Sequence, residues 1–227
     1  MAQRQTTVKA GIDALRERIV DAAMELGERT SWEAVRLHDV AGALGITLDQ
    51  VRRHFREKED LVDAWFDRAD AAMLNEAEST EFPGLSARQR LHRLIMTWLG
   101  ALALHRRVTR QMIYGKLEPG HIHIQFPGLM RVSRTVQWMR EAAHRDATYL
   151  RRALEETGLT TIYLMTFFHW MNDDSPESAR TGRVLDGWLA VAERLDRLVY
   201  SAPRRAAEKP PPDQPPPSPP GAGEPST

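Results

Sequence analysis

Apolar residues recur at helical spacing along most of the first 200 residues. Near the N-terminus they stand three or four positions apart, at Ile12, Leu15, Ile19, Ala23 and Leu26. A period near 3.6 predicts amphipathic helices, because residues so spaced share one face. Strand-like alternation occurs only in the short stretch HIHIQF at 121–126. The pattern therefore predicts an all-α protein with about nine helices.

Capping residues and helix breakers set the expected boundaries. Thr47 and Ser86 are each followed three residues later by glutamine, the capping-box pattern, so helices should begin at Leu48 and near Ser86. Ser175 before Pro176 predicts the start of the last helix. The segment EPGHIHIQFPG at 118–128 is expected to be a loop. Further helices are expected at about 57–79, 106–117, 129–143 and 149–171.

The last residues differ in composition from the rest. Ten of the 14 prolines lie between Pro203 and Pro225. Such a segment cannot form a helix or a central strand, so residues 202–227 are predicted to be a disordered tail with polyproline II character. A solvated spacer is the more common role for such a tail, and a scaffold that binds a partner through the prolines is the alternative.

The first functional signal lies in the short helices at the N-terminus. Gly45 ends the helix around 40–44 and permits a sharp turn, and Thr47 caps the next helix. Two short helices joined in this way form a helix-turn-helix. On the second of them, Val51 and Phe55 stand four residues apart and can face inward together. Its polar and cationic edge is left outside, where it suits the major groove of DNA.

This outer edge supplies candidate DNA contacts. Base contacts and register are expected from Thr47, Gln50, Arg52, Arg53 and His54. Phosphate contacts at the groove edge are expected from Arg36 and Lys58. A solvated basic face on an ordinary small helix is the alternative. Residues 36–58 hold five Lys or Arg against three Asp or Glu, so the pattern alone does not separate the two interpretations.

The stretch AVRLHDVAGALGITLDQVRRHFREKEDLVDAWFD at 34–67 resembles the DNA-binding region of the TetR family of bacterial repressors. The resemblance covers about the first 70 residues and is carried by Leu37, Asp39, Val40, Ala41, Gly45, Ile46, Thr47, His54, Phe55, Lys58, Glu59 and Leu61. The chain departs from the family pattern at Arg36, Leu48 and Arg52, where the family usually has Ser or Thr, Lys, and Tyr. The resemblance implies a homodimeric repressor that releases a palindromic double-stranded DNA operator when a ligand binds.

It also implies two domains, a DNA-binding domain at 1–56 and a ligand-binding and dimerisation bundle at 57–201. Methionine adapts to flexible apolar guests, so a small apolar or lipid-like ligand is expected. The candidate pocket residues are Trp98, Met112, Met130, Trp138, Met165 and Phe168. Ordinary core packing is the alternative for each.

Apolar stripes in the last two predicted helices exceed what one chain is expected to cover. The stripes consist of Ile162, Met165, Phe168, Val184, Trp188, Val191 and Leu195. A four-helix contact between two copies would bury them, so a homodimer is predicted.

Residues 149–189 also resemble the C-terminal domain of lipid-binding accessory proteins of ubiquinone biosynthesis, which share the TetR-like fold. The likeness is carried by Tyr149, Arg151, Arg152, Asp173, Asp174, Ser175 and Trp188. It implies an acyl or isoprenoid-like ligand, and it gives an alternative function, a lipid carrier that does not bind DNA. The helix-turn-helix of those proteins is degenerate, whereas here it is well formed, which favours a regulator.

Composition and motifs limit the other possibilities. The 31 basic and 31 acidic side chains balance, which still allows a local basic face because salt screens charges beyond about 10 Å. With no cysteine there is no thiolate chemistry, and no catalytic or cofactor motif occurs. His121 and His123 favour a surface loop over a metal site. Without a signal sequence or an 18-residue apolar run, a cytoplasmic protein without a membrane span is expected.

Overall fold

The computed structural model describes residues 2–117, 122–143 and 149–200 of the 227-residue chain. These residues form α-helices and three short 3₁₀ helices, with no strand among them. The α-helices are α1 (Ala2–Arg29), α2 (Leu37–Leu44), α3 (Leu48–Arg52), α4 (Lys58–Ala77), α5 (Ala87–Leu102), α6 (Arg106–Leu117), α7 (Ile122–Ala142), α8 (Tyr149–Trp170) and α9 (Ala179–Tyr200). The predicted all-α class is confirmed.

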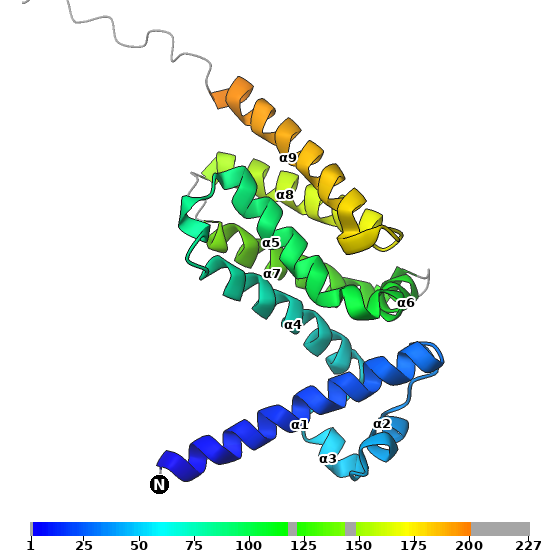
Figure 1. Ribbon diagram of the computed structural model, residues 1–227. Helices are drawn as coiled ribbons and strands as arrows, with labels where there is room; N and C mark the ends of the chain where they lie inside the picture. Colours follow the sequence, from blue (N-terminus) through cyan, green and yellow to red (C-terminus); the bar gives the residue numbers. More distant parts are fainter. Residues whose placement is uncertain (1, 118–121, 144–148, 201–227) are drawn as a thin grey trace, which may run out of the picture.

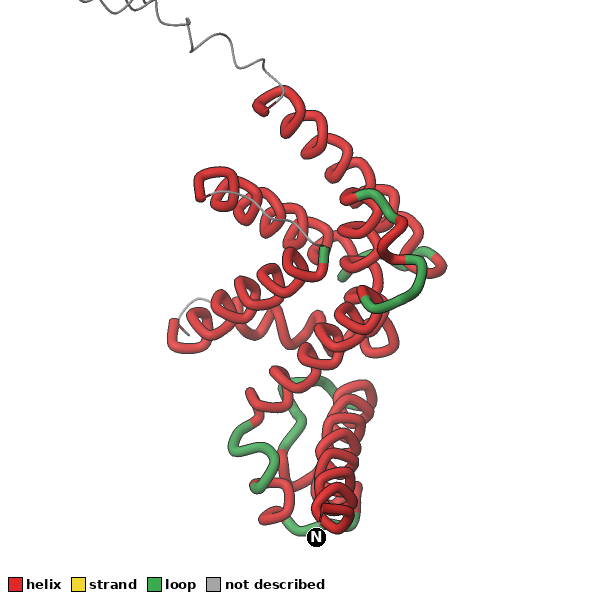
Figure 2. Tube along the Cα trace, turned by 90° about the vertical axis from the view of Figure 1, so that its left-hand side faces the viewer, coloured by secondary structure: helices red, strands yellow, loops and turns green. Residues whose placement is uncertain are grey.

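The helices form a small N-terminal unit and a larger body. Helices α1, α2 and α3 lie at one end of the molecule, and α4 leads from them into the body formed with α5 to α9 (Figures 1 and 2). The small unit has its own apolar centre, in which Ile19 of α1, Val40 of α2 and Val51 of α3 are fully buried. Burial of these side chains fixes α3 against the unit and turns its polar edge outward.

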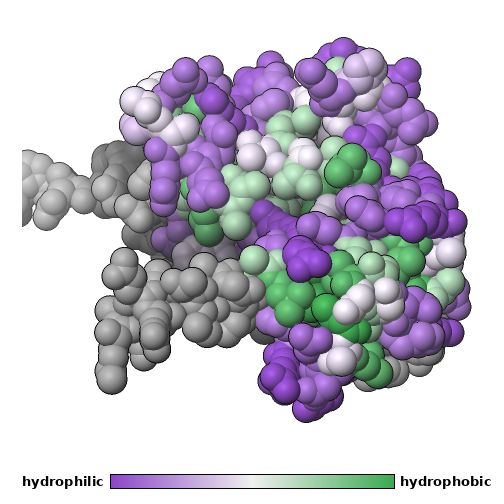
Figure 3. Space-filling view, turned by 60° about the horizontal axis from the view of Figure 1, so that its bottom comes forward, coloured by the Kyte–Doolittle hydropathy of each residue, from purple (hydrophilic) through white to green (hydrophobic). Residues whose placement is uncertain are grey.

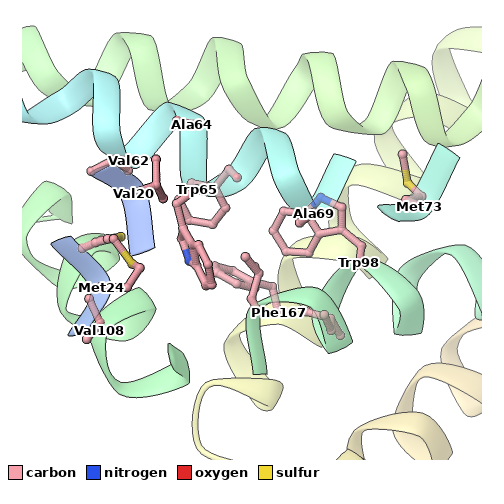
Figure 4. Packing of buried hydrophobic residues seen from close by; sticks show 14 of the residues in the cluster. Val20, Met24, Val62, Ala64, Trp65, Ala69, Met73, Trp98, Val108 and Phe167 are labelled. Atoms are coloured by element: carbon pink, nitrogen blue, oxygen red, sulfur yellow. The ribbon is translucent and has the colours of Figure 1, made fainter. Parts of the chain in front are cut away.

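Helix α1 also packs against the larger body. Its Val20 and Met24 lie beside Val62 of α4 and Val108 of α6 (Figure 4). At Gly27 the two backbones come close, since a Cβ atom there would stand 3.0 Å from Cγ1 of Val108. The end of α1 is therefore held directly by α6, and not only through the chain connection along α4.

Aromatic rings fill the core of the body where α4, α5 and α8 meet. Trp98 of α5 stacks on Phe66 of α4 with ring centres 5.8 Å apart. Tyr163 and Phe167 of α8 meet the Trp98 ring edge-on at 5.3 Å and 5.6 Å. Offset and edge-on contacts of this kind stabilise a core beyond the burial of area alone.

The segment from Ile122 onward corrects the sequence prediction. The loop expected at 118–128 is helical from Ile122, and the alternating residues from Ile122 to Phe126 belong to α7. Ile122 and Phe126 also stand four residues apart, a spacing that a helix accepts as well as a strand accepts the alternation. Residues 118–121 lie outside the described residues.

The last helix begins later than predicted. Pro176–Ser178 form a 3₁₀ turn, in which Glu177 and Ser178 have positive φ angles of 51° and 57°, and α9 starts at Ala179. The hydroxyl of Ser175 still accepts a hydrogen bond from the backbone N–H of Arg180 at 3.0 Å. The capping role of Ser175 is thus kept, with the helix start displaced by the strained turn.

The predicted tail at 202–227 and His121 lie outside the described residues, as does the side chain of His123. Nowhere in the described ranges does a group of metal-ligating side chains occur. None of the helices in these ranges is long and apolar enough to span a bilayer.

Candidate nucleic-acid interface

The helix-turn-helix is built by one glycine and one capping box. Gly45 follows α2 with φ 64° and ψ 31°, the left-handed conformation that glycine adopts at little cost. The hydroxyl of Thr47 then accepts from the N–H of Gln50 at 3.2 Å, and the side-chain oxygen of Gln50 accepts from the N–H of Thr47 at 2.9 Å. The predicted capping box is present, and it ties both side chains to the start of α3.

The two arginines of α3 share one acidic partner. Nη2 of Arg52 lies 2.9 Å from Oδ1 of Asp49, and Nη2 of Arg53 lies 2.9 Å from Oδ2 of the same carboxylate. The hydrogen bonds from Arg52 and then Arg53 hold the pKa of Asp49 below its usual value. Both arginine side chains remain 71% exposed, so a duplex can reach them.

The predicted phosphate contacts differ in their accessibility. Arg36 is exposed at the N-cap of α2 and makes no side-chain capping bond. Lys58 is half-buried, with Nζ 3.1 Å from the carbonyl oxygen of Glu33 and 4.8 Å from the centre of the Trp32 ring. Burial is the main cause that lowers the pKa of Lys58. Lys58 therefore braces the loop before α2 in this conformation.

His54 follows α3 at the boundary between its exposed edge and the core of the N-terminal unit. It is partly buried, and its ring centre is 6.4 Å from that of Phe55. The guanidinium of Arg16 from α1 covers the other ring, 5.3 Å from the centre of Phe55. Together these residues line a small polar hollow beside α3.

The structure separates the six predicted pocket residues. Trp98 and Met112 are buried in the core, whereas Trp138, Met165 and Phe168 are 40–49% exposed. Met130 lies in α7, and its side chain is outside the described residues.

Met165 and Phe168 belong instead to an exposed apolar surface on the last two helices. This surface continues on α9 with Trp188, Val191 and Leu195, all more than a third exposed. Figure 3 shows one face of the molecule, on which hydrophilic side chains prevail and apolar side chains gather in patches. Exposed apolar patches of this kind mark interaction surfaces.

A surface cleft of about 840 Å³ lies between α5 and the first half of α9. Met96 provides apolar lining, while Arg93 and Arg183 bring positive charge and Glu177 and Asp186 bring negative charge. Nε2 of His92 lies 3.0 Å from the carbonyl oxygen of Gly182 and joins the two walls. The volume falls in the usual range for small-molecule sites, and none of the six predicted pocket residues lines it.

The sequence analysis missed a buried charged network. Asp70 of α4 accepts hydrogen bonds from Nε1 of Trp98 at 2.8 Å, Oγ1 of Thr135 at 3.0 Å and Nη2 of Arg131 at 3.0 Å. Arg131 of α7 also bonds to Asp67 at 2.7 Å. The available signal was Asp70 itself, an acidic residue within the apolar stripe of a helix. The network joins α4, α5 and α7 across the core.

The sequence analysis also missed the polar contacts that α6 makes with the turn before α9 and with the end of α1. Arg106 donates to the carbonyl of Asp173 and to the hydroxyl of Ser178 in the turn before α9. Arg107 pairs with the carboxylate of Glu28 at 3.0 Å at the end of α1. Helix α6 thus contacts the turn between the last two helices and the N-terminal unit at once.

Comparison with known proteins shows which solved structures the chain is similar to. No family model and no curated protein matches the chain. A solved TetR transcriptional regulator from Nitrosomonas europaea ATCC 19718 is 57% identical, with a TM-score of 0.73 over 80% of this chain and 99% of that one. Regulators of the TetR family from Rhodococcus sp. RHA1 and Streptomyces coelicolor share the fold at 20% and 15% identity, with TM-scores of 0.56 and 0.58. They cover 78% and 83% of this chain, and 97% and 84% of their own. The likeness to lipid-binding accessory proteins finds no support in these matches.

Proposed function

This chain belongs to the TetR family of transcriptional regulators, and on that premise we propose that it represses genes as a homodimer that binds a palindromic operator. Residues 1–56 would bind DNA, and residues 57–201 would bind a ligand and form the dimer. The observation that carries the proposal is the capped helix α3, held by buried Val51 and exposing Arg52 and Arg53 at the end of the molecule. Two such heads about 34 Å apart would read successive turns of one groove.

The DNA-binding residues are proposed on their accessibility. Arg52 and Arg53 would contact base edges or phosphates, with His54 and Arg36 beside them. Thr47 and Gln50 would hold the start of α3 on the duplex through their capping bonds, and Lys58 would shape the loop that carries Arg36.

The test replaces both arginines of α3. Arg52→Ala with Arg53→Ala is expected to weaken operator binding by about tenfold or more per arginine that contacts a base. The matched control replaces Arg134 and Arg180, which are exposed on α7 and α9, with alanine and should leave binding unchanged. Binding is measured by fluorescence anisotropy on DNA from upstream of the protein's own gene. Equal binding by the α3 variant and the parent would refute the assignment of this surface.

The dimer is proposed to form through the exposed apolar surface on α8 and α9. Met165 and Phe168 would serve in this contact, and Trp98 and Met112 would support the core behind it. Side chains that are partly exposed in one chain become buried when two copies form a four-helix contact. Analytical ultracentrifugation of the parent should give a dimer.

A small apolar or lipid-like ligand is proposed to shift the protein out of its DNA-binding state. The cleft between α5 and α9 is a candidate ligand site, where Met96 would contact an apolar chain and Arg183 an anionic head group. The response would travel along α6, which holds α1 at Gly27 and Glu28, and along α4. A ligand shifts such an equilibrium only by its difference in affinity for the two states.

The ligand proposal is tested by mass spectrometry of lipid released from the purified protein. The compound found is then added to the protein–operator complex, and the release of the operator from the protein is followed by fluorescence anisotropy. Met96→Trp, which narrows the cleft, should weaken the response without weakening operator binding. A full response in this variant would place the ligand elsewhere.

A further inference from the structure

Asp49 occupies an unusual position on the proposed DNA-reading edge. It lies in the first turn of α3 and is followed three and four residues later by Arg52 and Arg53, so all three side chains lie on one side of the helix. Each of its two oxygens pairs with one arginine at 2.9 Å. The exposed edge of α3 therefore carries three charged side chains whose net charge is only +1.

Few other side chains on α3 could add positive charge or hydrogen-bond donors to this edge. The amide oxygen of Gln50 accepts from both the N–H and the hydroxyl of Thr47, at 2.9 Å and 3.2 Å. Leu48 is 52% exposed in the first turn and brings no charge. Arg52 in the last turn of α3 and Arg53 at its C-cap are thus the cations beside Asp49, and both of them are paired with it.

We propose that Asp49 sets the selectivity of DNA binding, because it holds Arg52 and Arg53 against capture by phosphates on duplexes that lack the operator sequence. The inference rests on the proposed function, and it names a specificity-determining residue for it. Phosphate attraction is the same on every sequence and supplies essentially all non-specific affinity. A carboxylate that pairs with both arginines and repels phosphates reduces this attraction on every duplex.

The operator can compensate for the carboxylate and random DNA cannot. In the major groove, a carboxylate accepts a hydrogen bond from the amino group of cytosine, and arginine donates two bonds to guanine. A correct site therefore gives all three side chains new partners. A random site offers phosphates to the arginines only, and leaves Asp49 facing negative charge.

The test compares the affinity of the full chain for two probes. One is a duplex that the parent protein selects from a random-sequence pool, and the other is an unselected random duplex of equal length. The variant Asp49→Asn should bind the random duplex about three- to tenfold more tightly, with a salt slope steeper by about one to two. Its affinity for the selected duplex should change by less than about twofold, because the lost carboxylate contact offsets the gain.

Two control variants separate pairing from net charge. Asp39→Asn removes the same charge from α2, at a side chain that is 47% exposed against 49% for Asp49. It should leave the ratio of the two affinities unchanged. Asp49→Glu keeps the carboxylate and should keep most of the selectivity. In a chain carrying Arg52→Ala and Arg53→Ala, the added change Asp49→Asn should raise the affinity for the random duplex much less than it does in the parent, because only the direct repulsion between Asp49 and phosphate is then removed.

Each result decides the matter. If the parent selects a sequence and Asp49→Asn leaves the affinity ratio unchanged, the role of Asp49 is overturned while the proposed function stands. The same holds if Asp39→Asn lowers the ratio equally, or if the effect of Asp49→Asn is undiminished without the two arginines. If the parent selects no sequence at all, the proposed function is overturned, and the selectivity role falls with it.

Discussion

Replacing Asp70 with alanine should strongly destabilise the folded protein. The carboxylate of Asp70 is 12% exposed and accepts hydrogen bonds from Trp98, Thr135 and Arg131. Asp70→Ala leaves the indole N–H of Trp98 and the hydroxyl of Thr135 buried without an acceptor. It also leaves Arg131, only 10% exposed, with one partner fewer.

The size of the effect follows from these groups. A buried donor left without an acceptor lowers the free energy of unfolding by about 1–3 kcal/mol. Removing one partner of a buried ion pair lowers it by about 3–5 kcal/mol in total. Arg131 keeps its bond to Asp67, which is 49% exposed, so we expect about 3–4 kcal/mol. For a chain of this size that corresponds to a fall in Tm of about 6–16 °C.

The assay is urea unfolding followed by circular dichroism, with parent and variant at one protein concentration because oligomers gain stability with concentration. Asp67→Ala is the control, since Asp67 lies on the same helix and pairs with the same arginine but is exposed; it should cost less than about 1 kcal/mol. The double variant Asp70→Leu with Arg131→Met should recover part of the loss. A loss below about 1 kcal/mol in Asp70→Ala would refute this account of the network.

Three further outcomes are expected. Gly27→Val should destabilise the contact of α1 with α6 by about 1–3 kcal/mol in urea unfolding, and Val108→Ala should restore part of it, because the new side chain overlaps Val108. Trp188→Asp should shift the protein from dimer to monomer in sedimentation at micromolar concentration, and an unchanged dimer would move the interface elsewhere. Burial opposes ionisation of Asp173, but its hydrogen bonds with Ser175 and Thr181 outweigh burial and lower its pKa, so its stabilisation is present above about pH 4 and lost as pH falls through the lowered pKa. Asp173→Asn should therefore be less stable than the parent at pH 7, and unfolding midpoints of the two should converge in acid.

Much of the fold could be predicted because its signals are local. Apolar spacing near 3.6 residues gives helices, and Thr47 with Gln50 and Ser86 with Gln89 form the capping boxes that the sequence predicts. Gly45 adopts the expected left-handed conformation. The prediction was wrong at 122–128, where the expected loop belongs to α7, and at the start of α9, where a strained turn precedes the helix.

The sites depend on contacts between distant segments, and these could be predicted only in part. The outward edge of α3 follows from Val51 and Phe55 facing inward. The inward turn of Lys58 onto Trp32 does not, since it needs two segments brought together by folding. The same applies to Met165 and Phe168, because helical apolar stripes look alike whether a pocket, a core or another subunit covers them.

The sequence by itself determined the all-α class, the capped helix α3 and its cationic edge, because each rests on interactions within a few residues of the chain. Only the tertiary structure decided that Asp70 and Arg131 meet in the core, and that α6 links α1 to the turn before α9. It also decided which apolar residues stay exposed. These features join residues more than 50 positions apart, and a side chain's burial and partners depend on what the rest of the chain packs against it.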